Sequence, residues 1–216
     1  RKGKYNSDGS SNIIPGSNIP MAALGVWILW LGWFGFNGGS ELVVSNEAAA
    51  IAVSQVFLNT NIAAAGGVVA TLVTSQLVTK KMDITMAMNG AIAGLVAITA
   101  APSAPSAGAA LMIGAVGGII VYFSIIILDR RFGIDDPVGA ISAHGVVGIW
   151  GVMAVVFTGG SLVSQFVGVL AIAGFTYLMS LLTILFIDRF IPIRATDEEQ
   201  EVGLDATETG VKSTTY

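Results

Sequence analysis

Long apolar runs separated by short polar segments dominate the chain. Four stretches contain no Asp, Glu, Lys or Arg: residues 9–40, 48–79, 84–128 and 137–187. A helix needs roughly 20 residues to cross about 30 Å of hydrocarbon. The first two stretches therefore have room for one membrane span each, and the last two have room for two each.

Both of the longest stretches contain a helix-breaking segment near the middle. Ala-Pro-Ser-Ala-Pro-Ser at 101–106 divides one, and Gly-Gly-Ser at 159–161 divides the other. Proline and glycine clusters of this kind are typical of turns between helices. The pattern therefore predicts an all-α membrane protein with six transmembrane helices, at roughly 19–37, 50–78, 85–100, 109–128, 138–158 and 162–187.

The distribution of charge agrees with six spans. With that number, all ten Lys and Arg residues lie on one side of the membrane, in the segments 1–18, 79–84, 129–137 and 188–216. The opposite side carries only Glu41 and Glu47. Cytoplasmic loops are enriched in Lys and Arg, so the basic side is the cytoplasmic one.

This orientation gives a multi-pass protein of the cell membrane in three parts. We expect a cytoplasmic lead-in at 1–18, a transmembrane region at 19–190 and a cytoplasmic C-terminal tail at 191–216. Lipid surrounds the middle part, and small residues such as Ala63–Gly67 and Gly114–Gly118 allow its helices to pack closely.

Composition excludes several other classes of protein. Charged residues make up 11% of the chain, whereas a soluble domain carries about 25%. There is no basic stripe for nucleic acid, and without cysteine there is no disulfide or thiolate nucleophile. The chain begins with Arg1 rather than Met and has no signal peptide, which suggests that its beginning is missing.

His144 is the only histidine and the first candidate for chemistry. Asp136 is suited to cap a helix whose first turn contains Pro137, which would place His144 roughly 12 Å along the axis. An ionisable group at that depth usually faces a cavity, a pathway or a partner. We favour a functional histidine; a structural one, bonded to a neighbouring helix, is the alternative.

Enzymatic sites are not expected. Asp135 and Asp136 are adjacent and no span holds a second acid, whereas an aspartyl protease needs two facing carboxylates. Gly38-Gly39-Ser40 does not form a Gly-x-Ser-x-Gly elbow. We therefore predict no catalytic residues, no metal and no cofactor.

The segment 32–40, Gly-Trp-Phe-Gly-Phe-Asn-Gly-Gly-Ser, lies at the outer end of the first span. Aromatic clusters there most often form a belt at the lipid headgroups. Aromatic faces with a hydroxyl also suit a cation of the size of ammonium, through cation–π attraction and a hydrogen bond. Composition alone favours the belt.

Four segments, taken in order, resemble the ammonium transporter (Amt/Mep/Rh) family. Besides 32–40 they are Phe-Leu-Asn-Thr-Asn at 57–61, Asn-Gly-Ala-Ile-Ala-Gly-Leu-Val-Ala-Ile-Thr at 89–99 and the region 135–151 that contains His144. The resemblance implies eleven spans, as two inverted five-helix halves and a final long helix, in homotrimers with one pore per subunit. This chain would be the C-terminal half, helices six to eleven, without its N-terminal half.

The resemblance also assigns roles to residues. His144 matches the second of the paired pore histidines, Phe36 a phenylalanine of the outer gate, and Ser40 the serine of the outer ammonium site. Residues 198–205 resemble the cytoplasmic tail, which can meet PII-type regulators, although 208–211 departs from the family pattern. Gly38 stands where the family commonly has alanine.

The function expected from the resemblance is ammonium transport. Ammonium would be recruited outside, deprotonated, and passed as ammonia through an apolar pore with histidine-assisted proton handling. Two alternatives stay open. The same membrane fold could be an ammonium sensor that signals to a cytoplasmic partner, or the chain by itself could be a scaffold half without activity.

Overall fold

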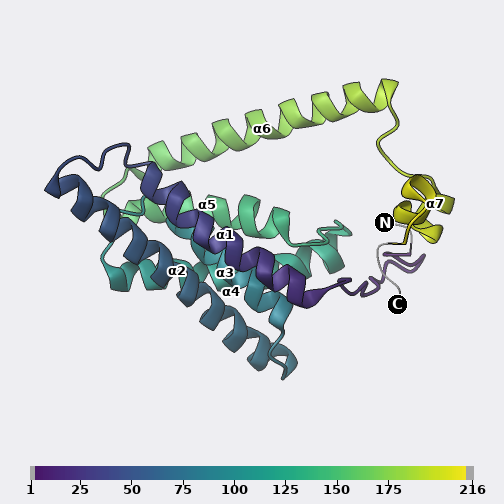
Figure 1. Ribbon diagram of the computed structural model, residues 1–216, viewed down its shortest axis with the longest axis horizontal. Coiled ribbons are helices and arrows are strands. Elements are labelled where there is room, and N and C mark those ends of the chain that lie inside the picture. Colours follow the sequence, from purple (N-terminus) through teal and green to yellow (C-terminus); the bar gives the residue numbers. More distant parts are fainter. Residues whose placement is uncertain (1–2, 213–216) are drawn as a thin grey trace. The chain divides into compact units, whose positions relative to one another are not determined.

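A computed structural model describes residues 3–212 of the chain. Within them the secondary structure is helical, apart from an isolated antiparallel β-bridge between Tyr5 and Ser11. This confirms the all-α prediction (Figure 1). The elements are α1 (Ile19–Gly39), α2 (Glu47–Thr79), α3 (Ile84–Ile98), α4 (Ala107–Phe132), η1 (Ile141–Val146), α5 (Val147–Ala154), η2 (Val155–Thr158), α6 (Leu162–Phe190), α7 (Asp197–Val202) and η3 (Asp205–Thr209).

Polar side chains fix where the helices start. Asn18 accepts a hydrogen bond from the Met21 amide at 2.9 Å and begins α1, and Asn46 accepts one from Ala49 at 2.9 Å and begins α2. Asp83 caps α3 in the same way. Each cap satisfies amides that have no partner within the helix.

The helices differ in whether they are long enough to cross a membrane. By length and composition, α1, α2, α4, α6 and the continuous segment Ile141–Thr158 are long and apolar enough to do so. The expected third span, α3, has 15 residues, which corresponds to about 22 Å and falls short of the roughly 30 Å hydrocarbon core.

The chain divides into two structural units. The larger, Asn18–Phe166, contains α1 to α5 and η2. The other comprises Arg1–Ser17 and Val167–Tyr216, and holds most of α6 with α7 and η3. A capping box begins α7, in which Thr196 and Glu199 bond each other's backbone amides.

Glycines let the backbones of α2, α3 and α4 touch in the larger unit. A Cβ at Gly94 of α3 or at Gly114 of α4 would overlap the carbonyl oxygen of Ala63, and one at Gly67 would overlap that of Gly90. The prediction that small residues mediate close packing is confirmed at these positions. Contacts this close replace the hydrophobic driving force that is missing in lipid.

The start of the fifth helical segment differs from the prediction. Residue 138 was the expected start, but Pro137 and Val138 lie in a turn and the helix begins at Ile141. Gly139 allows this turn, since its φ of 73° is in the left-handed region. The estimate that His144 lies 12 Å along an α-helix from Asp136 is therefore wrong, because residues 137–139 form a turn and residues 141–144 belong to a π-helical turn.

Asp136 still caps the segment, from further away than expected. Its two carboxylate oxygens accept hydrogen bonds from the amides of Ile141 and Ser142, both at 3.0 Å. The turn at 137–139 folds the carboxylate back over the first amides of η1. The capping role assigned from the sequence is confirmed, with a different geometry.

Candidate functional site

A groove of about 770 Å³ in the larger unit contains two of the three predicted site residues. It is formed by side chains of α1, the end of α3, and the η1–α5 segment. Most of them are apolar, and Phe36 and His144 are both among them. The full lining is Ile28, Leu29, Gly32, Trp33, Phe36, Val96, Thr99, Ala100, His144, Gly148 and Val152.

Trp33 connects the two predicted residues inside this groove. Its ring stacks on the His144 ring, with 6.3 Å between centroids and 18° between planes. It also meets Phe36 edge-on, with centroids 5.8 Å apart. Stacked and edge-on pairs are the favoured arrangements of aromatic rings. The three rings therefore form a continuous aromatic wall.

A hydrogen-bonded pair holds the Trp33 ring in place. Its Nε1 donates to Thr99 Oγ1 at 2.8 Å, and the Thr99 hydroxyl lies 2.7 Å from the Leu95 carbonyl. Neither Trp33 nor Thr99 is among the site residues predicted from the sequence. Trp33 lies three residues before Phe36, a spacing that puts both on one face of a helix but does not distinguish a pathway residue from one of a headgroup belt.

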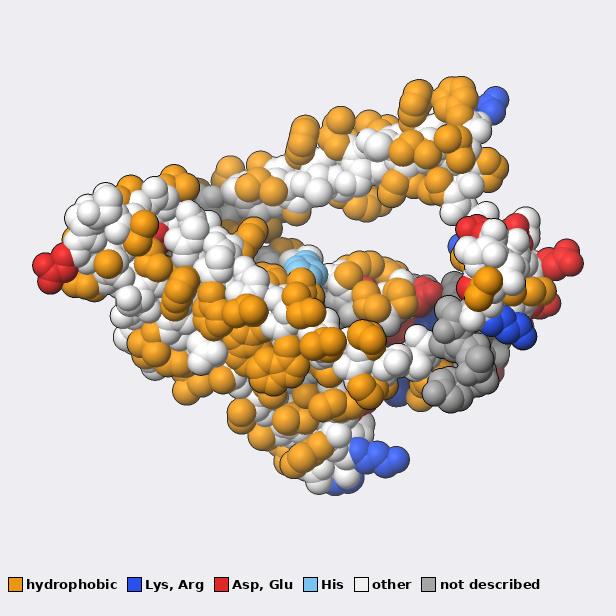
Figure 2. Space-filling model, viewed as in Figure 1, with side chains coloured by type: hydrophobic (Ala, Val, Ile, Leu, Met, Phe, Trp, Pro, Cys, Tyr) orange, Lys and Arg blue, Asp and Glu red, His pale blue; other side chains and the backbone are white. Residues whose placement is uncertain are grey.

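The His144 ring is exposed to the groove and makes no hydrogen bond with any residue from 3 to 212. Figure 2 draws this histidine in pale blue, among apolar side chains of the visible face. A structural histidine would be bonded to a neighbouring helix, and no such bond occurs in the described part of the chain. Both ring nitrogens are therefore available to a ligand.

Ser40 lies outside the groove, just beyond the end of α1. It is exposed, and its hydroxyl donates to the Phe36 carbonyl at 2.8 Å. Because the hydroxyl hydrogen is used there, the lone pairs of the oxygen remain free to accept from another donor. The structure thus brings Phe36 and His144 into one groove and leaves Ser40 one turn further along.

Contacts with α2 hold the end of α1 that carries Phe36 and Ser40. Asn37, which is 2% exposed, donates from Nδ2 to the Thr60 hydroxyl at 3.0 Å. Next to it, Gly38 is buried against the ring of Phe57. These contacts fix the outer part of the site to the helix core.

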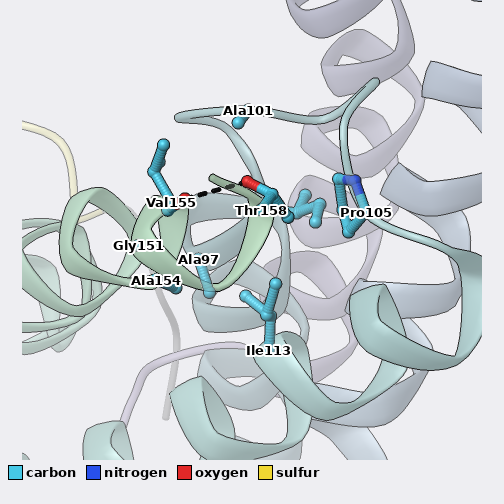
Figure 3. Close-up of a pocket in the computed structure, with 9 residues that line it drawn as sticks. Ala97, Ala101, Pro105, Ile113, Gly151, Ala154, Val155 and Thr158 are labelled. Atoms are coloured by element: carbon cyan, nitrogen blue, oxygen red, sulfur yellow. Dashed lines mark hydrogen bonds between the residues drawn. The ribbon is translucent and has the colours of Figure 1, made fainter. Parts of the chain in front are cut away.

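A second cavity, of about 10 Å³, lies near the C-terminal ends of α3 and α5 (Figure 3). Its walls are almost entirely apolar, and the Thr158 hydroxyl on its edge bonds the Val155 carbonyl at 2.9 Å. A space of this size holds one water molecule at most. We regard it as a packing gap.

Comparison with known proteins places these features in one family. Residues 1–214 match the model of the Ammonium Transporter Family. The chain is 45% identical over 162 residues to the ammonium transporter Amt2 of Archaeoglobus fulgidus, which covers 74% of this chain and 34% of that protein. It is 35% identical to an ammonium transporter of Bacillus subtilis, over 91% of this chain and 52% of that protein.

Solved structures agree with the sequence comparison. A protein described as a Sensor Amt Protein superposes with a TM-score of 0.88 at 36% identity, over 95% of this chain and 53% of its own. Mep2 of Candida albicans does so with a TM-score of 0.77 at 27% identity, over 91% of this chain and 48% of its own. The chain thus spans about half or less of these relatives.

Several apolar helices of membrane-spanning length accompany these matches, so the chain is part of a multi-pass membrane protein. The match to the family model covers residues 1–214, which include the groove and its aromatic wall. The chain belongs to the Ammonium Transporter Family.

Proposed function

We propose that this chain forms one wall of an ammonium pathway through the membrane, with Phe36 and His144 in the pathway and Ser40 at its outer mouth. The observation that carries the proposal is the His144 ring, which has no hydrogen-bond partner in the described residues and faces an apolar groove beside Trp33. The relatives named above as ammonium transporters support the choice of substrate.

Ser40 serves to recruit the cation. Its hydroxyl hydrogen is bonded to the Phe36 carbonyl, so the oxygen can accept from an N–H of ammonium. The ring of Phe36 is 62% exposed and lies one turn inward, where it narrows the entrance. Aromatic faces attract a cation before it loses its charge.

The apolar groove provides selectivity against potassium. Ammonium and potassium are similar in size, so a simple sieve cannot separate them. A narrow apolar passage rejects an ion that keeps its charge, whereas ammonium can release a proton and continue as ammonia. The imidazole of His144 either accepts a hydrogen bond from ammonia or passes on the proton that ammonium releases. Both are open to it because a neutral imidazole offers one donor and one acceptor nitrogen.

The complete protein supplies what this chain lacks. Family resemblance implies an N-terminal half that provides the opposite wall and a second histidine, and a homotrimer with one pore per subunit. The positive-inside distribution of Lys and Arg orients residues 1–18 and the tail 191–216 toward the cytoplasm. A PII-type regulator would meet that tail.

An ammonium sensor is the second candidate, favoured by the likeness to the Sensor Amt Protein structure. A sensor binds ammonium and signals to a cytoplasmic partner while conducting little. Currents measured in liposomes separate the two functions, because a transporter gives a saturable ammonium current and a sensor gives ligand binding without flux.

His144→Ala in the complete protein tests the role of the histidine. We expect ammonium current, or selectivity over potassium, to fall by roughly tenfold or more, since proton transfer by a positioned side chain contributes about 10²–10⁴. Ile149→Ala is the matched control, because Ile149 is 46% exposed and lies outside the groove. Selective transport at the wild-type rate in His144→Ala would remove the histidine from the mechanism.

A further inference from the structure

His144 lies in a π-helical turn, η1, and this local geometry needs an explanation. A π-helix bonds each amide to the carbonyl five residues earlier, so its turn is wider than that of an α-helix. Such turns are rare, short and frequent at functional sites. In η1 the neighbouring Ser142 and Ala143 are buried, whereas His144 is exposed to the groove.

One contact fixes η1 laterally to the helix core. Ser124 of α4 donates from its hydroxyl to that of Ser142 at 3.0 Å. Ser142 is 0% exposed and Ser124 is 8% exposed, so water does not compete for this bond. In the described part of the chain it is the only side-chain hydrogen bond between η1 and another helix.

The rest of η1 is held by packing, such as that of the buried Ala143, and by the stacking of His144 on Trp33, and no other side chain of η1 hydrogen-bonds another helix in the described residues. Ala143 and Gly145 have no polar side chain, and the nearest atom to a Cβ built at Gly145 is Ile141 Cγ2, at 4.0 Å. The carboxylate of Asp136 fixes only the beginning of the turn, through the amides of Ile141 and Ser142. Ser142 is therefore held through both its amide and its hydroxyl.

We propose that Ser142 is a positioning residue for His144: its bond to Ser124 keeps the π-helical turn in the rotation that presents the imidazole to the groove and to Trp33. Without the bond, η1 can rotate or tighten toward an α-helix, and the His144 ring leaves the groove. This inference rests on the pathway proposed above, in which His144 takes part.

The test uses Ser142→Ala, Ser124→Ala and the double variant in the complete transporter, reconstituted in liposomes. Interhelical hydrogen bonds in membranes have strengths that correspond to about a threefold to thirtyfold shift in an equilibrium. Each single variant should lower the maximal ammonium flux by that factor and leave the apparent affinity unchanged, because Ser40 is untouched. The double variant should be no worse than either single one, since both remove the same bond.

Two further variants separate positioning from general stability. Ser124→Thr keeps the hydroxyl and should transport like the wild type. Ser75→Ala removes a buried serine hydroxyl that bonds the Lys81 carbonyl at 2.8 Å. Ser75 belongs to α2, which does not contact η1 in the described residues, so this variant should leave the flux unchanged. A loss of flux in Ser75→Ala equal to that in Ser142→Ala would contradict a specific role for Ser142.

A readout on the histidine itself distinguishes failure of this inference from failure of the proposed function. The rate at which diethyl pyrocarbonate modifies His144, followed by the mass of its peptide, should change in Ser142→Ala and Ser124→Ala but not in Ser75→Ala. Wild-type flux and wild-type labelling in both serine variants would overturn the positioning role, while leaving the pathway intact. If His144→Ala transports normally, the pathway role fails, and the labelling rates alone then decide whether Ser142 positions the ring.

Discussion

At the scale of single residues, Trp33 joins the two predicted pathway residues by stacking on His144 and meeting Phe36 edge-on. His144 and Phe36 could be proposed from the sequence, because each belongs to a long segment that resembles one family. Trp33 and Thr99 could not, because a tryptophan near the end of a span is equally typical of a headgroup belt. Only the Trp33 hydrogen bond to Thr99, at 2.8 Å, shows that this ring faces inward.

Gly38 lies against Phe57, where the family resemblance leads us to expect alanine. A Cβ there would overlap Cε1 of Phe57. Gly38→Ala should therefore displace the Phe57 ring, and because that ring is 41% exposed and can shift, the free energy of unfolding should fall by about 1 kcal/mol, the low end of what overpacking costs. Thermal unfolding in detergent measures the loss.

The double variant Gly38→Ala with Phe57→Leu provides the control for this prediction. A smaller side chain at 57 leaves room for the new methyl group, so the double variant should recover most of the stability. If Gly38→Ala unfolds at the wild-type temperature, or if Phe57→Leu gives no recovery, the two residues do not constrain each other in this way.

At the scale of elements, the positions of helix breakers and caps could be predicted from the sequence. The irregular start of the fifth helical segment could not. Pro-rich residues 101–106 and Gly-rich residues 159–161 separate helices as expected, because such residues act locally. The start of the fifth segment was placed at 138 instead of 141, since proline after aspartate is typical of a first helical turn. The π-helical geometry of η1 depends on the tertiary bond between Ser124 and Ser142, which no local pattern contains.

Two glycines of α4 test the close packing of the core. Gly114 faces the Ala63 carbonyl, whereas nothing lies within 4 Å of a Cβ at Gly108. Alanine is favoured over glycine in a helix by about 1 kcal/mol, so Gly108→Ala should be neutral or stabilising. Gly114→Ala should push α4 away from α2 and lower the unfolding temperature. Equal behaviour of the two variants would argue against backbone contact between these helices.

The short helix α7 should respond to acid. Hydrogen bonds from the Thr196 amide and then the Thr196 hydroxyl lower the pKa of the exposed Glu199 carboxyl from its ordinary value of 4.5. A lowered pKa means that the ionised form is stabilised in the folded state. The stabilisation is present above pH 4.5 and is lost as the pH falls through the lowered pKa.

Side-chain NMR of Glu199 measures this directly, by following its carboxyl carbon as the pH is lowered. The titration midpoint should lie below 4.5 in the wild type and rise toward it in Thr196→Ala, which removes the hydroxyl donor and keeps the amide. Glu198, on the same helix, is the reference carboxyl. A midpoint at the ordinary value in the wild type would mean that the capping box does not persist in solution.

At the scale of the whole molecule, the chain covers about half or less of its relatives' length. The groove that contains His144 is open on one side. The sidedness of the basic residues stays a prediction. The order of the apolar spans could be predicted from the sequence because it reflects the thickness of a bilayer. The groove could not, because it depends on which faces of α1, α3 and α5 meet.

The most direct test of the account asks whether ammonium passes along this groove. In the complete transporter, freed of other cysteines, Val96→Cys places a thiol in the groove, and Met112→Cys places one on an exposed part of α4 outside it. Ammonium current in liposomes is then measured before and after reaction with a small thiol reagent, with labelling of both variants verified by mass. We predict that labelling at 96 blocks the current and labelling at 112 does not. An undiminished current after complete labelling at 96 would contradict the assignment of the groove as the pathway.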